Sequence, residues 1–275
     1  MVSNRYKLLV IDVDGTLVNR YGKISVEDKA AVAKGRDSGV CVSLSTGRVL
    51  KACINIIRQL SLNSYHITFD GALVSSADHS QELYVQPISQ EVVKKMVEVA
   101  HAHNLDLELF TATDYFTERE TWSTKAHRQF FGVAATIVEF TNLVEKARII
   151  KGGLVTTTPE EATKAQRFCQ QFGYSLHSSW ARTPAYPGVD FINLLAPQVS
   201  KGKALETLAS HLGISLSEVI AVGDGTNDMP LLASAGLAIA MGNAPDEDKK
   251  VADHTTHDID HSGVAAAINK FLLER

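Results

Sequence analysis

Residues 8–17 read Leu-Leu-Val-Ile-Asp-Val-Asp-Gly-Thr-Leu, an apolar run of strand length that ends in two acids one residue apart. Side chains alternate along a strand, so Asp12 and Asp14 start on one side and Val13 on the other. Gly15 allows the backbone to turn tightly after the strand. Carboxylates at the carboxyl end of a strand lie where open α/β sheets bind ligands, and such oxygen pairs suit Mg²⁺. Two aspartates separated by one residue also occur in ordinary turns. The rest of the sequence is therefore needed to distinguish a metal site from a turn.

The composition of the chain limits the classes of protein that it can represent. Its 275 residues, 45% hydrophobic and 21% charged, are typical of a soluble globular protein with one or two domains. The net charge of -4 provides no basic surface for nucleic acid, and no apolar run is long enough to cross a bilayer. No signal peptide is visible, and the three scattered cysteines fit reduced thiols. We therefore expect a cytoplasmic protein, either a monomer or a homodimer, that binds neither nucleic acid nor membranes.

The first part of the chain alternates between strand and helix patterns. Ser25 is a candidate N-cap for a helix that ends near Gly39, and an apolar strand at 40–44 follows. A second helix is expected at 49–60 and a third strand at 66–69. This order predicts a parallel sheet with right-handed crossovers.

The middle of the chain has a different pattern. Residues 105–110 alternate between leucine and polar residues, which indicates a half-exposed strand of an antiparallel sheet. The block is far longer than a single crossover between parallel strands requires. We therefore predict an α/β protein with a core domain formed by 1–82 and 189–275, and an inserted α+β cap domain formed by 83–188.

The strand and helix alternation resumes after the insert. Ser200 is a candidate cap for a helix at 201–212, and a buried strand at 219–222 runs into Gly-Asp-Gly-Thr-Asn-Asp. Three strands then end in polar turns, and the carboxyl ends of parallel strands meet at one edge of a sheet. The side chains expected at this edge are suited to binding a phosphate monoester together with a divalent cation. They are Asp12, Asp14, Thr46, Asn227, Asp224, Asp228 and the nearby Lys201.

The same residues form four motifs in a characteristic order. They are Asp12-Val13-Asp14-Gly15-Thr16, Thr46-Gly47-Arg48, Lys201-Gly202-Lys203 and Gly223-Asp224-Gly225-Thr226-Asn227-Asp228. With an insert between the second and the third, the chain resembles the haloacid dehalogenase-like hydrolase superfamily, specifically the Cof-type phosphatases of subfamily IIB. The resemblance implies a Rossmann-like core with a C2B-type cap. One departure is Asp70, because this family often has Asn before the following glycine.

The resemblance also implies the chemical roles of the acids. Asp12 is expected to be the nucleophile that forms an aspartyl-phosphate. Asp14 is expected to protonate the leaving oxygen and then to take a proton from the water that hydrolyses the intermediate. Asp12, the backbone carbonyl of Asp14, and Asp224 are expected to hold Mg²⁺. Asp228 is expected to orient Lys201 or a metal-bound water.

The residues expected to bind the phosphate are Thr46, Gly47, Lys201 and Asn227. Simpler roles are open for two of them, since Thr46 could be a helix cap and Lys201 an ordinary solvated lysine. In the insert, Trp122, Phe130 and Trp180 are expected to be core residues, and Arg182 is retained as a substrate-binding candidate. The spacing of His254, His257 and His261 favours a polar surface loop over a zinc site.

These observations favour a Mg²⁺-dependent phosphatase of small phosphorylated metabolites, such as sugar phosphates. A phosphosugar mutase of the same superfamily and a catalytically silent binding protein are the alternatives. Intact Asp12, Asp14, Lys201 and Asp224 argue against the silent protein. A dehalogenase is disfavoured, because it has no leaving oxygen to protonate and needs no Mg²⁺.

Overall fold

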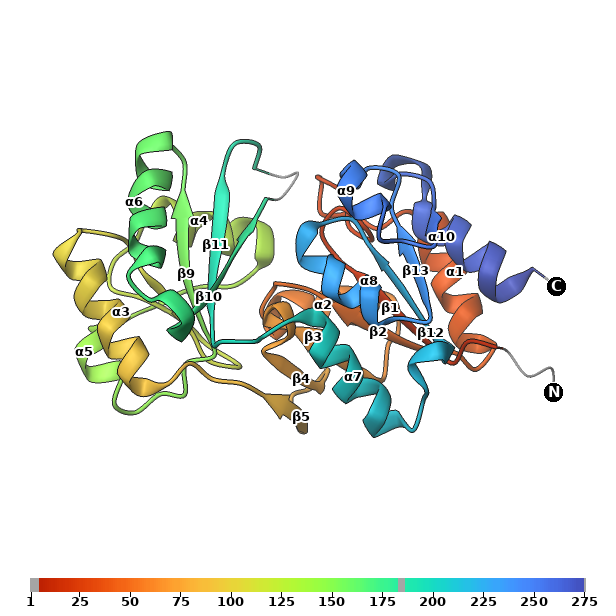
Figure 1. Cartoon of the computed structure of the whole chain (residues 1–275), viewed down its shortest axis with the longest axis horizontal. Coiled ribbons are helices and arrows are strands. Elements are labelled where there is room, and N and C mark those ends of the chain that lie inside the picture. The colour runs from red at the N-terminus through yellow and green to blue at the C-terminus, as the bar shows by residue number, and fades with distance from the viewer. Residues whose placement is uncertain (1–4, 183–185, 275) are drawn as a thin grey trace. The chain divides into compact units, whose positions relative to one another are not determined.

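The computed structural model describes residues 5–182 and 186–274, which divide into two compact units (Figure 1). The first comprises the described residues of Met1–Thr46, Ile54–Tyr84 and Ser200–Arg275, and the second comprises Gly47–Cys53 and Val85–Val199. The second unit thus extends past 188 and includes a short segment of the N-terminal region. The assignment of core and cap domains to these units remains a prediction.

The first unit is built on a mixed sheet whose central strand carries Asp12. The strands lie in the order β14-β13-β12-β1-β2-β3-β4-β5. The five from β14 to β2 pair in parallel, as does β2 with β3, whereas β3 and β4 form an antiparallel pair. The predicted α/β class is confirmed. The strand bounds are β1 (Leu8–Asp12), β2 (Cys41–Ser45), β3 (Tyr65–Thr68), β4 (Leu73–Ser76), β5 (Glu82–Val85), β12 (Val219–Gly223), β13 (Leu237–Ala240) and β14 (His254–Thr255).

Both faces of strand β1 are buried, as its uninterrupted apolar sequence requires. Leu8 and Val10 pack in a cluster with Leu205 and other apolar residues of α7 and α8. Ser25 caps α1 by accepting the N–H of Asp28, as predicted. The helices are α1 (Val26–Asp37), α2 (Leu50–Gln59), α7 (Lys201–Leu212), α8 (Met229–Ser234), α9 (Asp246–Lys249) and α10 (Gly263–Ile268). In the described part of the chain, no helix has the length and apolarity needed to cross a membrane.

The second unit contains a separate sheet in the order β10-β11-β9-β6-β7-β8. Four of its five strand pairs are antiparallel, in agreement with the alternating sequence pattern. One face packs its leucines and isoleucine against α3 and α6, which lie together beside the sheet in Figure 1. The elements are α3 (Gln90–Ala102), β6 (Glu108–Phe110), β7 (Tyr115–Thr117), α4 (Trp122–Ala126), β8 (Thr136–Ile137), α5 (Phe140–Leu143), β9 (Lys151–Thr156), α6 (Pro159–Gln170), β10 (His177–Ala181) and β11 (Asp190–Leu195).

Two expectations for this unit differ from the structure. Only the second half of 105–110 forms a strand, because the N–H of Leu107 turns back to the carbonyl of Leu105 before β6 begins. Trp122 and Trp180 are exposed, so the expectation that they belong to the core is wrong, and the side chain of Phe130 lies outside the described residues. Alternation identifies which side chains share a face, but it does not reveal whether the backbone pairs.

We predict that Gly71→Ala destabilises the protein much more than Gly39→Ala. Both glycines have a left-handed backbone, with φ of 102° and 92°. A Cβ at Gly71 would lie 2.3 Å from the carbonyl oxygen of Ser200, whereas a Cβ at Gly39 would meet nothing within 4 Å. Gly39→Ala should cost about 1 kcal/mol from the backbone alone, and Gly71→Ala about 1–3 kcal/mol more from the steric clash. Urea unfolding of both variants tests this, and equal midpoints would contradict it.

Candidate active site

The end of strand β1 places Asp12 in the interior of the first unit. Asp12 is buried, and Asp14, past the first bend, is half-buried. The N–H of Gly15 donates to the carbonyl of Val18 and closes the turn. Gly15 has a φ of 90°, and a Cβ there would lie 2.3 Å from Asp224 Oδ2. The glycine therefore brings the first motif and the fourth motif into direct proximity.

Lys201 connects the two acidic motifs through a buried ammonium group. Its Nζ lies 2.6 Å from Asp12 Oδ1 and 2.6 Å from Asp228 Oδ1, and the side chain is only 1% exposed. Burial alone would lower the pKa of Lys201, but the carboxylates of Asp12 and Asp228 outweigh this and raise it. Lys201 is therefore charged at neutral pH and is not an ordinary surface lysine. It begins α7, whose N-cap Ser200 accepts the N–H of Lys203.

The turn after β12 holds Asp228 in one orientation. Asp228 Oδ2 accepts the N–H groups of Asp224 and Gly225, both at 3.0 Å. Its other oxygen faces Lys201. A four-residue spacing between the two acids allows the second carboxylate to close the turn that carries the first.

Asp224 is held by two polar side chains from other segments. Its Oδ1 accepts the hydroxyl of Thr16 at 2.6 Å, and its Oδ2 accepts the amide of Asn243 at 3.2 Å. Burial and the nearby Asp228 carboxylate raise the pKa of Asp224 to about 7. Burial and Asp228 also raise the pKa of Asp12, against the lowering effect of Lys201. The site is thus crowded with negative charge that one ammonium group does not balance.

Three of the predicted acids converge on a common point. One oxygen each of Asp12, Asp224 and Asp228 lies within 4.8 Å of the others. Within 5–182 and 186–274, no other group of three acidic, histidine or cysteine side chains has this proximity. The Asp14 carboxylate is not part of the group, and the expected contribution of its backbone carbonyl remains a prediction. The arrangement fits an oxygen-liganded divalent cation.

The other predicted site residues lie at neighbouring strand ends. Thr46 follows β2, is buried, and donates its N–H to the carbonyl of Ile67. Asn227 donates its side-chain amide to Asp70 Oδ1 at 2.9 Å. Asp70 is buried, has a φ of 53°, and donates its N–H to the carbonyl of Thr46.

Three further side chains contact the predicted site residues without having been predicted as part of the site: those of Asp70, Thr16 and Asn243. Asn243 also donates to the carbonyl of Gly15 at 2.9 Å. Thr16 belongs to the first motif, and Asn243 lies in the stretch Met-Gly-Asn-Ala near the C-terminus. The side chains of Thr16 and Asn243 point toward Asp224 because of tertiary contacts. Their position within or near the motifs is therefore the only sequence signal that could have suggested a role for them.

Arg182 and the three histidines occupy other environments. Arg182 is highly exposed and its Nε lies 2.6 Å from Asp190 Oδ1. His261 Nδ1 lies 2.6 Å from Asp258 Oδ1, and His254 stacks edge-on against the ring of Phe271. The described histidines do not converge as metal ligands.

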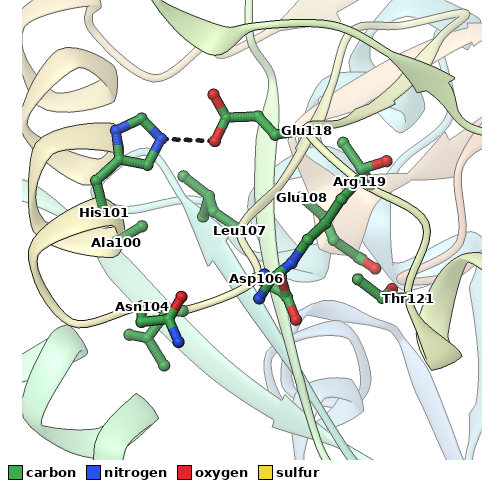
Figure 2. A pocket seen from close by; sticks show the side chains of 11 residues that line it. Ala100, His101, Asn104, Asp106, Leu107, Glu108, Glu118, Arg119 and Thr121 are labelled. Atoms are coloured by element: carbon green, nitrogen blue, oxygen red, sulfur yellow. Dashed lines mark hydrogen bonds and ion pairs between the residues drawn. The ribbon is translucent and has the colours of Figure 1, made fainter.

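The second unit also contains a polar cavity of about 210 Å³, shown in Figure 2. It lies between the C-terminal end of α3 and the strands β6 and β7. His101 Nε2 lies 2.5 Å from Glu118 Oε2 on its wall, and Arg119 Nε lies 2.6 Å from Asp106 Oδ1. The cavity therefore contains none of the predicted catalytic acids.

The chain as a whole is similar to known proteins. A family model of haloacid dehalogenase-like hydrolases matches residues 9–268. The chain belongs to this family. The family assignment and the predicted enzyme class, a phosphatase of this superfamily, are confirmed.

Two relatives and one solved structure illustrate the similarity. Phosphatase YwpJ of Bacillus subtilis is 29% identical over 288 residues, covering 97% of this chain and all of YwpJ. The 5-amino-6-(5-phospho-D-ribitylamino)uracil phosphatase YcsE of Bacillus subtilis is 27% identical, covering 97% of this chain and 96% of its own. A haloacid dehalogenase-like hydrolase from Bacteroides thetaiotaomicron has the same fold, with a TM-score of 0.85, 24% identity and coverage of 96% and 99%.

We predict that Lys201→Ala destabilises the folded protein, whereas Lys203→Ala on the same helix does not. Removing Lys201 leaves the carboxylates of Asp12 and Asp228 buried without their ammonium partner, which typically costs about 3–5 kcal/mol. Lys203 is exposed, and its loss should change stability by less than about 0.5 kcal/mol. Thermal unfolding of the two variants in the presence of a metal chelator measures the difference, and similar melting temperatures would show that the buried contacts are not needed.

Proposed function

We propose that this protein is a Mg²⁺-dependent phosphatase that hydrolyses small phosphorylated metabolites through an aspartyl-phosphate intermediate. The observation that carries the proposal is the buried contact of Lys201 with Asp12 and Asp228, beside the raised-pKa carboxylate of Asp224. An anionic nucleophile can approach an anionic phosphate only where fixed positive charge offsets the repulsion. The buried ammonium group and a cation held by the acids would provide that charge.

The acidic cluster fits Mg²⁺ in its chemistry. Burial and the nearby carboxylate of Asp228 raise the pKa of Asp12 and Asp224, and a divalent cation would relieve the repulsion among the three converging carboxylates. Asp12, the backbone carbonyl of Asp14, and Asp224 would hold it, and Asp228 would orient Lys201 or a bound water. When bound, the cation supplies positive charge next to the transferred phosphoryl group.

The chemistry proceeds in two steps on the residues of the first motif. A carboxylate oxygen of Asp12 attacks phosphorus, the bond from phosphorus to the ester oxygen breaks, and Asp14 gives its proton to that oxygen. Water then attacks phosphorus, Asp14 takes the proton from water, and inorganic phosphate leaves as the Asp12 carboxylate is restored. Asp14 suits this role because it lies past the bend and is only half-buried.

Thr46, Gly47, Lys201 and Asn227 are the proposed phosphate-binding residues. The amide of Asn227 is oriented by Asp70, whose backbone is in turn held by Thr46. Arg182 is the candidate in the second unit, where Asp190 fixes its guanidinium. Because Thr46, Gly47, Lys201 and Asn227 would bind the phosphate, the alcohol part of the substrate must be recognised by other residues. The name of the YcsE relative gives a phosphorylated metabolite as its substrate, which supports a small phosphorylated metabolite here as well.

We predict that the purified protein releases inorganic phosphate from acetyl phosphate with Mg²⁺ and loses this activity when the metal is removed. Chelation followed by Mg²⁺ should restore the rate, whereas Ca²⁺ should do so poorly, because it favours larger and more flexible coordination. Release of phosphate is measured by a colorimetric assay. Full activity after exhaustive chelation would refute the metal requirement, and no activity with any cation would refute the phosphatase.

We predict that Asp12→Asn and Asp14→Asn have different kinetic signatures. Asp12→Asn removes the nucleophile, so no phosphorylated enzyme should form. Asp14→Asn keeps the nucleophile but lacks a base for water, so the phosphorylated enzyme should accumulate with a leaving group that needs no protonation. Rapid-quench mass spectrometry of the peptide containing Asp12 tests this, and phosphate on Asp14 or on a histidine would overturn the assignment.

A further inference from the structure

The first unit contains a further buried carboxylate, that of Asp70, whose negative charge the proposed chemistry does not use. Asp70 lies in the short turn between β3 and β4 and is 5% exposed. Its Oδ1 accepts the side-chain amide of Asn227 at 2.9 Å, and its N–H donates to the carbonyl of Thr46 at 3.0 Å. Asp70 therefore contacts two of the proposed phosphate-binding residues within the same unit.

The charge of Asp70 also acts on a third phosphate-binding residue, Lys201. Burial would lower the pKa of Lys201, but the two carboxylates in contact with its ammonium group, followed by that of Asp70, raise it. The backbones of the two segments are packed together, because a Cβ at Gly71 would lie 2.3 Å from the carbonyl oxygen of Ser200. The carboxylate of Asp70 is thus fixed near the start of α7, where Lys201 lies.

Neither the backbone nor the contact with Asn227 requires a negative charge at this position. Asp70 has a φ of 53°, in the left-handed region that asparagine adopts as readily as aspartate. The side-chain oxygen of an asparagine would also accept the amide of Asn227. These two features therefore explain a short polar side chain at Asp70, but they do not account for its charge.

A negative charge at Asp70 opposes the binding of an anion by its neighbours. A phosphate held by Thr46, Asn227 and Lys201 would share all three residues with the carboxylate of Asp70. In a protein site of effective dielectric constant about 20, repulsion between two charges about 10 Å apart changes a binding constant by about tenfold. Inorganic phosphate would be held by the same groups as the phosphate of the substrate. A site with a buried ammonium group and a divalent cation would retain this product unless another charge opposed it.

We propose that Asp70 lowers the affinity of the site for phosphate and thereby promotes release of the inorganic phosphate product. The phosphoryl group is negatively charged in the substrate, in the product and during its transfer, so the repulsion affects binding throughout and does not favour the chemical step. Asp70 is therefore a residue that sets the affinity for phosphate and takes no part in bond making. This inference rests on the proposed phosphatase function and concerns the response of that site to its own product.

Titration calorimetry of inorganic phosphate into the protein in the presence of Mg²⁺ tests the proposal. Asp70→Asn removes the charge, keeps an acceptor for Asn227 and suits the left-handed backbone. We expect this variant to bind phosphate about tenfold more tightly than the unmodified protein. Glu206→Gln is the matched control, because Glu206 is an exposed carboxylate on α7, the helix that begins at Lys201. The control should change the affinity for phosphate by less than about twofold, since solvent and salt screen an exposed charge.

The direction of the change separates an effect of charge from an effect of orientation. If Asp70 acted only by orienting Asn227, Asp70→Asn would leave the affinity for phosphate unchanged or weaken it, and either result would overturn the inference. An equal gain in Glu206→Gln would also overturn it, because net charge alone would then explain the effect. An unmodified protein that neither binds phosphate nor hydrolyses acetyl phosphate would refute the proposed phosphatase function together with the inference.

Steady-state kinetics of acetyl phosphate hydrolysis provide a second readout. Asp70→Asn should lower the inhibition constant of inorganic phosphate and the KM for acetyl phosphate by similar factors, each about tenfold, without raising kcat. A higher kcat with an unchanged KM would show that Asp70 acts on the chemical step, and this result would contradict the proposal while leaving the phosphatase function intact.

Discussion

The first unit depends on one interaction, the contact of the Lys201 ammonium with two carboxylates that come from separate strands. Asp12 ends β1 and Asp228 follows β12, so the contact fixes α7 against both strand ends. Close approach is possible only where side chains are absent. A Cβ at Gly202 would lie 2.4 Å from the carbonyl of Pro230, and one at Gly223 would lie 2.7 Å from the side chain of Asp228. The glycines of the third and fourth motifs therefore serve the packing that brings the charges together.

Much of this arrangement could be predicted from the sequence, because it follows from local rules. Strand β1, the cap at Ser25 and the helix from Lys201 to Leu212 depend on apolar patterns and capping residues that a few neighbouring positions reveal. The convergence of Asp12, Asp224 and Asp228 follows from the geometry of parallel strands.

The parts that were not predicted depend on distant contacts. Asp70 adopts a positive φ because the chain reverses there between β3 and the antiparallel β4, and the dipeptide Asp-Gly alone does not specify which partner its carboxylate meets. The amide of Asn243 reaches Gly15 from 228 residues away. The same holds for Glu108, which alternation placed on a half-exposed strand but which is buried beneath hydroxyl groups and an imidazole.

The two units contain buried carboxylates whose pKa values are shifted in opposite directions. Glu108 is compensated by two hydroxyl groups and an imidazole, so its pKa is lowered and its site is electrostatically complete. Burial and the Asp228 carboxylate raise the pKa values of Asp12 and Asp224, and the single ammonium group of Lys201 leaves their site with excess negative charge. Excess negative charge of this kind favours the binding of a cation. The compensated carboxylate of Glu108 has no comparable need for a cation.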